Sequence, residues 1–93
     1  MAKETILVVD DSPTELKIVS KALSGQGYRV VTAVDGDEAL VKAVAEKPNL
    51  IVLDVVLPKK NGFQVCRTLK TGAETKNIKI LLLTSKSQES DRF

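Results

Sequence analysis

The sequence predicts an open α/β domain in which a doubly wound parallel sheet carries helices on both faces. Three short apolar runs, at residues 6–9, 50–53 and 80–83, contain no alternating polar residues, which is typical of strands buried on both faces. Segments with helical spacing lie between these runs, so strands and helices alternate along the chain. Right-handed crossovers leave few ways to connect such elements.

The first helix is expected directly after the strand at residues 6–9. Ser12 can cap this helix, Pro13 suits its first turn, and Glu15 completes a capping box. Gly25 and Gly27 are expected to end it. Helical spacing places four apolar residues on its packed face: Ile18, Val19, Ala22 and Leu23.

A weaker strand is expected at residues 29–33, followed by a helix that opens at Asp35 and stops at Pro48. Its inward residues are expected to be Ala39, Leu40, Ala43 and Val44.

After the strand at residues 50–53, Asn61 and Gly62 predict a turn. A third helix at about residues 63–70 should bury Val65, Cys66 and Leu69. A polar loop at residues 71–77 then leads to the strand at 80–83, and another helix is expected to begin at Ser85.

Length and composition indicate a single domain spanning residues 1–93. Hydrophobic residues make up 43% of the chain and charged residues 28%, an ordinary globular balance. The net charge of +2 gives no argument for nucleic acid or an anionic membrane as a partner. Cys66 is the single cysteine and histidine is absent, which disfavours a zinc site and fits a reducing, cytoplasmic setting.

Each strong strand run is followed by, or ends in, an oxygen-bearing side chain. Asp10 and Asp11 follow the first, Asp54 follows the second and Thr84 follows the third. In open α/β sheets the ligand crevice lies outside the carboxyl ends of the strands, so we expect these side chains to converge. Taken singly, Asp10 and Asp11 also fit a helix dipole, and Asp54 and Thr84 fit ordinary strand ends; their joint placement favours a site.

Three neighbouring carboxylates repel one another, and a hard divalent cation relieves that repulsion. Mg²⁺ prefers oxygen ligands and keeps several waters, and Mn²⁺ can take its place. With the cation bound, a carboxylate can attack a phosphoryl group and form an aspartyl phosphate.

Four motifs in this order resemble the receiver domains of two-component response regulators, the CheY-like family: residues 6–12 (ILVVDDS), 53–58 (LDVVLP), 61–63 (NGF) and 83–85 (LTS). Residues 61–64 and 84–89 further resemble the stand-alone PilH-type regulators of twitching motility and phototaxis. The resemblance implies a flavodoxin-like sheet with strand order 2-1-3-4.

The resemblance also implies a role for each site residue. Asp54 is the phosphorylated residue, and Thr84 is the switch hydroxyl. Asp11 binds Mg²⁺ directly, Asp10 binds it through water or orients the site, and the Val56 backbone carbonyl supplies another ligand. The implied partners are a sensor histidine kinase or phosphotransfer protein and a downstream target, which for the PilH type lies in motility or pilus function.

The family has a fifth strand, which ends in a lysine that pairs with the phosphoryl group, and a last helix. Neither is present in these residues, so the receiver domain is expected to be incomplete at its C-terminus. If the chain ends at Phe93, we expect self-association or domain swapping through residues 80–93, because an unpaired apolar edge is a template for another chain.

Two other functions are compatible with the sequence. One is a receiver-like interaction scaffold that never carries phosphate, which the missing lysine favours and the intact Asp11 and Asp54 disfavour. The other is a small metal-dependent phosphohydrolase, for whose substrate cap these 93 residues leave no room. The sequence therefore favours a phosphoacceptor switch over an enzyme with turnover.

Overall fold

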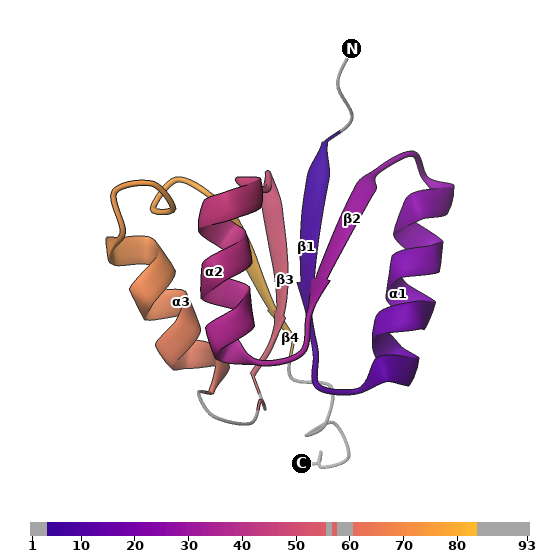
Figure 1. The fold of residues 1–93 in the computed structure, drawn as a ribbon, viewed down its shortest axis with the longest axis horizontal. Helices are drawn as coiled ribbons and strands as arrows, with labels where there is room; N and C mark the ends of the chain where they lie inside the picture. Colours follow the sequence, from indigo (N-terminus) through magenta and orange to yellow (C-terminus); the bar gives the residue numbers. More distant parts are fainter. Residues whose placement is uncertain (1–3, 56, 58–60, 84–93) are drawn as a thin grey trace, which may run out of the picture.

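A computed structural model describes residues 4–55, 57 and 61–83 of the chain, and Figure 1 shows their arrangement. The elements follow one another as β1 (Thr5–Val9), α1 (Pro13–Gly25), β2 (Arg29–Ala33), α2 (Gly36–Glu46), β3 (Leu50–Asp54), α3 (Gly62–Thr71) and β4 (Lys79–Leu83). The strands pair in parallel in the order β2-β1-β3-β4. This arrangement confirms the predicted α/β fold and strand order. The helix expected at Ser85 lies outside the described residues.

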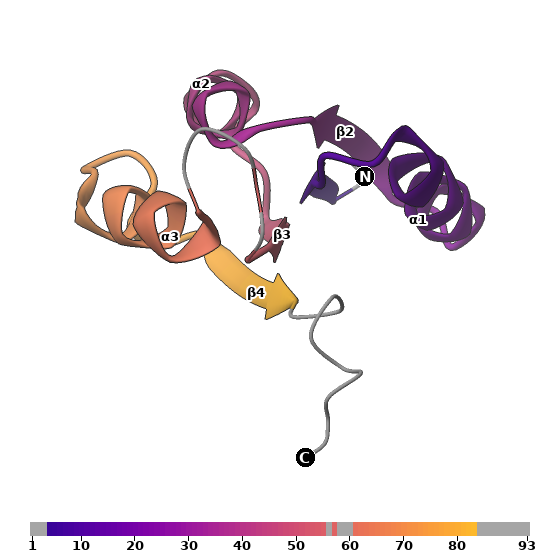
Figure 2. The same cartoon turned by 90° about the horizontal axis from the view of Figure 1, so that it is seen from below.

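The helices form a layer on each face of the sheet. Helix α1 lies on one face, and α2 and α3 lie on the other (Figures 1 and 2). The strand order explains this division, because the chain first adds β2 on one side of β1 and then returns to add β3 on the other. Right-handed crossovers that run in opposite directions place their helices on opposite faces. Within the described ranges, no helix is long and apolar enough to cross a membrane.

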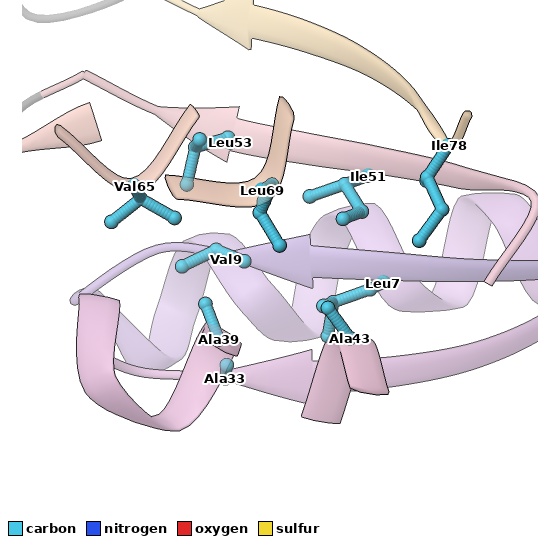
Figure 3. Close-up of a cluster of buried hydrophobic side chains, with 10 residues drawn as sticks. All are labelled: Leu7, Val9, Ala33, Ala39, Ala43, Ile51, Leu53, Val65, Leu69 and Ile78. Atoms are coloured by element: carbon cyan, nitrogen blue, oxygen red, sulfur yellow. The ribbon is translucent and has the colours of Figure 1, made fainter. Parts of the chain in front are cut away.

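Strand β1 is buried on both faces, as its unbroken apolar run predicts. Leu7 and Val9 point into the larger core, between the sheet and the layer of α2 and α3, and Ile6 and Val8 point toward α1. Figure 3 shows the larger core, whose ten buried residues come from all the strands but β4, from α2 and α3, and from the residue before β4: Leu7, Val9, Ala33, Ala39, Ala43, Ile51, Leu53, Val65, Leu69 and Ile78.

Strand β4 differs from the prediction that it is buried on both faces. Its side chains alternate, with Ile80 and Leu82 packed against the larger core and Leu81 51% exposed. The reason is its place at the edge of the described sheet, away from α1, where no described helix covers the second face (Figure 2). The apolar run alone cannot distinguish such an edge strand from a central one.

Helices α1 and α2 each bury a narrower stripe than the sequence predicts. In α1, Leu16, Val19 and Leu23 pack toward the sheet, whereas Ile18 is 58% exposed and Ala22 is also exposed. A straight helix turns about 100° per residue, so residues 18 and 22 lie on the next stripe, away from the sheet. Similarly, α2 buries Ala39 and Ala43 and half-buries Leu40, but leaves Val44 46% exposed.

The N-caps of α1 and α2 form as expected, but the capping box predicted for Ser12 and Glu15 is incomplete, because the Ser12 N–H donates to Asp10 Oδ1 rather than to Glu15. The Ser12 hydroxyl accepts a hydrogen bond from the Glu15 N–H at 3.3 Å, and the Asp35 carboxylate accepts one from the Glu38 N–H at 2.8 Å. The Val34 N–H donates to Glu38 Oε1 at 2.8 Å, and this bond, with the Lys42 ammonium beside it, lowers the pKa of the Glu38 carboxyl. These contacts fix the N-terminal ends of α1 and α2 at the carboxyl ends of the strands that precede them.

The helix ends also agree with the sequence to within one or two residues. Helix α1 ends at Gly25, and Gly27 follows with φ of 97°. Helix α2 ends at Glu46. The next residue, Lys47, takes the left-handed conformation and precedes Pro48. Helix α3 begins at Gly62, one residue earlier than expected.

Truncation of a core side chain tests the packing of β1. Leu7 is fully buried in the larger core, so Leu7→Ala should lower the free energy of unfolding by about 3 kcal/mol, through lost transfer energy and a residual cavity. Val41 is 67% exposed, and Val41→Ala should change it by less than about 0.5 kcal/mol. Urea denaturation followed by circular dichroism measures both. Equal effects of the two substitutions would contradict the assigned core.

Candidate functional site

The structure brings the three predicted acidic residues together. Asp10 and Asp11 directly follow β1, and Asp54 is the last residue of β3. Val9 pairs with Leu53 in the β1–β3 ladder, so the residues that follow them leave both strands at the same level. One carboxylate oxygen from each aspartate lies within 4.8 Å of one from each of the others. Three carboxylates therefore converge at the carboxyl ends of β1 and β3, where the strand order reverses.

Main-chain contacts hold the strand ends that present these side chains. The Asp10 N–H donates to the Ala33 carbonyl at 3.1 Å, which extends the β1–β2 pairing by one residue. The Asp10 Oδ1 atom accepts from the Ser12 N–H at 3.0 Å, which orients that carboxylate beside the start of α1. Past β3, the Val55 N–H donates to the Leu83 carbonyl at 3.0 Å. The acidic cluster thus stands at the ends of β1 and β3, which pair with each other and with β2 and β4, rather than on a free loop.

Burial is graded across the cluster. Asp54 is only 1% exposed, Asp10 is half-buried and Asp11 is exposed. The cluster is therefore reached from solvent at Asp11, while Asp54 forms its floor. Each of the three carboxylates has further interactions in the structure.

The chemistry of the cluster fits a hard divalent cation. Three like charges at this separation repel one another, and burial of Asp54 removes much of the water that would screen them. An all-oxygen set of carboxylates suits Mg²⁺ or Mn²⁺, and the exposed side at Asp11 leaves room for the waters that Mg²⁺ keeps. The arrangement can hold one such ion beside the Asp54 carboxylate.

Two of the predicted site residues, Val56 and Thr84, lie outside the described residues. The roles expected for the Val56 carbonyl and the Thr84 hydroxyl therefore stay predictions.

The sequence did not indicate how closely α3 packs against Asp54. The Gly62 N–H donates to the Val55 carbonyl at 2.7 Å, and Gly62 is buried. Asn61 caps α3, and its side chain and that of Gln64 form a reciprocal capping box at 2.9 and 3.2 Å. Asn61 and Gly62 were expected to form a turn. One feature of the sequence could have indicated this contact: Gly62 directly follows the capping residue Asn61. Glycine is unfavourable in a helix, so its presence there suggests that a side chain would not fit.

The fold and the site together define a class of protein: a flavodoxin-like α/β domain with a carboxylate cluster at the carboxyl ends of its strands. The family model described as response regulator receiver domain matches residues 6–93. The chain belongs to this family. Receiver domains are the phosphoacceptor modules of two-component systems and are phosphorylated on an aspartate.

Curated relatives agree with the family. The chain is 41% identical over 87 residues to protein PilH of Pseudomonas aeruginosa, an alignment that covers 94% of this chain and 72% of PilH. The chain spans only 35 to 38% of the next three curated relatives it matches.

Solved structures agree as well. Chemotaxis response regulator CheY4 of Vibrio cholerae is similar with a TM-score of 0.86 and 36% identity, over 95% of this chain and 78% of that one. The receiver domain of sensor histidine kinase PA1611 from Pseudomonas aeruginosa, solved with a magnesium ion coordinated in its active-site cleft, has a TM-score of 0.87 and 28% identity, over 98% and 75% of the two chains.

Metal titration tests the acidic cluster. We expect Asp11→Ala and Asp54→Ala each to weaken Mg²⁺ binding by about tenfold or more, because each removes a charged oxygen ligand. Glu74→Ala serves as the control. Glu74 lies in the connection between α3 and β4, at the amino ends of the strands and therefore away from the acidic cluster. Titration calorimetry measures the dissociation constants. Unchanged isotherms for both aspartate variants would show that the ion does not bind here.

Proposed function

We propose that the chain is a phosphoacceptor switch in which Asp54 takes a phosphoryl group from a histidine kinase or a phosphotransfer protein. The observation that carries this proposal is the position of Asp54, buried at the end of β3 with an oxygen within 4.8 Å of those of Asp10 and Asp11. Membership of the receiver family supports the same role.

In the proposed transfer, a carboxylate oxygen of Asp54 attacks the phosphorus of a phosphohistidine. The new O–P bond forms as the P–N bond breaks, and the leaving imidazole nitrogen keeps the electron pair and takes up a proton. Hydrolysis reverses the state of Asp54: water attacks the phosphorus, inorganic phosphate leaves and the carboxylate is restored. No redox step is involved.

Asp10, Asp11, Asp54 and the Val56 backbone carbonyl would hold Mg²⁺, or Mn²⁺ in its place. When bound, the cation neutralises charge on the phosphoryl oxygens and on the acidic cluster. The protein's own part is to orient Asp54 through the paired end of β3 and to shield it from bulk water. The PA1611 receiver, with magnesium in its cleft, supports this assignment by analogy.

Thr84 is proposed to donate its hydroxyl hydrogen to a phosphoryl oxygen and to move on phosphorylation. This movement would report the state of Asp54 to a downstream target. Similarity to PilH supports a target in motility or pilus function, and we place the exchange in the cytoplasm, the setting that the single, unpaired Cys66 fits.

A phosphodonor assay tests the proposed acceptor. Acetyl phosphate with Mg²⁺ should add one phosphoryl group to the intact chain, and borohydride trapping followed by tandem mass spectrometry should locate it on Asp54. Asp54→Asn, which keeps the size of the side chain but removes the nucleophilic carboxylate, should give no adduct.

Other outcomes of this assay identify the rival functions. Absence of any adduct on the unmodified sequence would support a non-phosphorylated scaffold, and continuous release of phosphate would support a hydrolase. An adduct of equal yield on Asp54→Asn would contradict the assignment of Asp54.

The lifetime of the adduct gives a separate prediction. The Val56 side chain is apolar and cannot orient a hydrolytic water. Val56→Asn should therefore shorten the half-life of the aspartyl phosphate, by about threefold or more, because an amide can hydrogen-bond that water. Val56→Ala, which is smaller but still apolar, is the matched control. An unchanged or longer half-life for Val56→Asn would contradict this explanation.

A further inference from the structure

Gly62, the first residue of α3, packs directly against the backbone of Asp54 and Val55 in the acidic site. A Cβ atom placed on Gly62 would lie 2.6 Å from the Asp54 carbonyl oxygen and 2.7 Å from Val55 Cα. Both distances are roughly 1 Å shorter than the separation at which nonbonded heavy atoms normally meet. The helix can therefore approach the end of β3 this closely only because residue 62 has no side chain.

Backbone conformation is not what demands glycine here. Among the described glycines, a positive φ is found at Gly27, not at Gly62. Gly62 is the first residue of α3 and has a conformation that any amino acid can adopt. A glycine in a helix also costs roughly 1 kcal/mol relative to alanine. The close approach to Asp54 is the compensating gain.

The contact is clamped from both sides. Asp54 is held in β3, whose residues pair with β1 and with β4, up to the Asp54–Leu83 pair. Gly62 is held by its N–H bond to the Val55 carbonyl at 2.7 Å and by the capping box of Asn61 and Gln64 at the start of α3. A side chain at position 62 would therefore force the start of α3 away from the backbone of Asp54 and Val55 at the end of β3.

We propose that Gly62 is a positioning residue that sets the backbone at Asp54 and Val55 so that the acidic cluster can share one divalent cation. Mg²⁺ demands near-ideal octahedral geometry, and ligand distances hold to within about 0.2 Å. A displacement of Asp54 by several tenths of an ångström would exceed that tolerance in the ligand distances. This inference rests on the proposed function, since it assigns Gly62 to the same site.

Two other glycines provide matched controls. A Cβ at Gly25, the last residue of α1, would meet nothing within 4 Å. A Cβ at Gly72, just past the opposite end of α3, would lie 2.6 Å from the Thr75 hydroxyl, which itself donates to the Leu69 carbonyl. Gly72→Ala therefore disturbs the same helix without touching Asp54, whereas Gly25→Ala should disturb nothing.

The experiment compares Gly62→Ala, Gly72→Ala and Gly25→Ala with the unmodified chain. Urea denaturation measures stability, and calorimetry measures the Mg²⁺ dissociation constant. We expect Gly62→Ala to weaken Mg²⁺ binding by about tenfold or more, the usual effect of losing an outer support of a metal site. Gly72→Ala should lower stability but leave the dissociation constant within about twofold. Gly25→Ala should also leave the dissociation constant unchanged, and it should keep or slightly raise stability, because alanine favours a helix more than glycine does.

Equal loss of affinity in Gly62→Ala and Gly72→Ala would overturn the proposal, because the effect would then follow stability alone. Unchanged affinity in a folded Gly62→Ala variant would also overturn it. If Gly62→Ala gives no cooperative unfolding even with sucrose as a stabiliser, Gly62 is needed for folding rather than for positioning, which again overturns it.

Amide shifts of the metal-free protein separate this proposal from the proposed function. If the unmodified chain binds no Mg²⁺, the proposed function fails. Shift changes in Gly62→Ala that centre on Asp10, Asp54 and Val55 would still support the positioning role, and changes confined to α3 would refute it.

Discussion

Parallel pairing between β1 and β3 determines where the acidic side chains of the receiver domain lie. The pairing of Val9 with Leu53 ends both strands at the same level, so Asp10 and Asp54 emerge side by side. β1 keeps this register because its apolar side chains are buried on both faces, by α1 on one side and by the layer of α2 and α3 on the other. A slip of one residue would move every side chain of the strand to the opposite face. The site geometry is therefore a consequence of core packing.

The same geometry brings together carboxylates whose mutual repulsion a divalent cation would relieve. The cluster places a buried carboxylate, Asp54, close to two others of equal charge. Repulsion of this kind disfavours the folded state unless positive charge or hydrogen bonds compensate for it. Binding of a divalent ion to the folded state alone would stabilise that state, and the exposed Asp11 provides the approach for the ion. In the proposed function, metal affinity and reactivity at Asp54 would therefore depend on the same energetic balance as folding, and the close packing of Gly62 is proposed to adjust it.

Much of the fold and the acidic cluster could be predicted because both depend on order along the chain. Buried parallel strands have continuous apolar runs, and their carboxyl ends meet at one edge, so Asp10 and Asp54 could be placed together from sequence. The packed stripe of α1 could not be resolved, because Ile18 and Val19 are equally apolar and only the sheet decides between them. Likewise, an apolar run does not reveal an edge position, which explains the exposed Leu81. The sequence at Asn61 and Gly62 predicted only a turn. The close contact that Gly62 permits involves backbone atoms of Asp54 and Val55, so the glycine itself is the only sign of it in the sequence.

The most direct test of the central claim is an amide-shift map on addition of beryllium fluoride, a tetrahedral phosphoryl mimic that binds a carboxylate oxygen beside Mg²⁺. If the cluster at the ends of β1 and β3 is the phosphoacceptor site, the largest shift changes should centre on Asp10, Asp11, Asp54 and Val55 and should require both Mg²⁺ and beryllium fluoride. They should vanish in Asp54→Asn. Shift changes centred elsewhere, for example on the outer face of α3, or changes that persist in Asp54→Asn, would contradict the account.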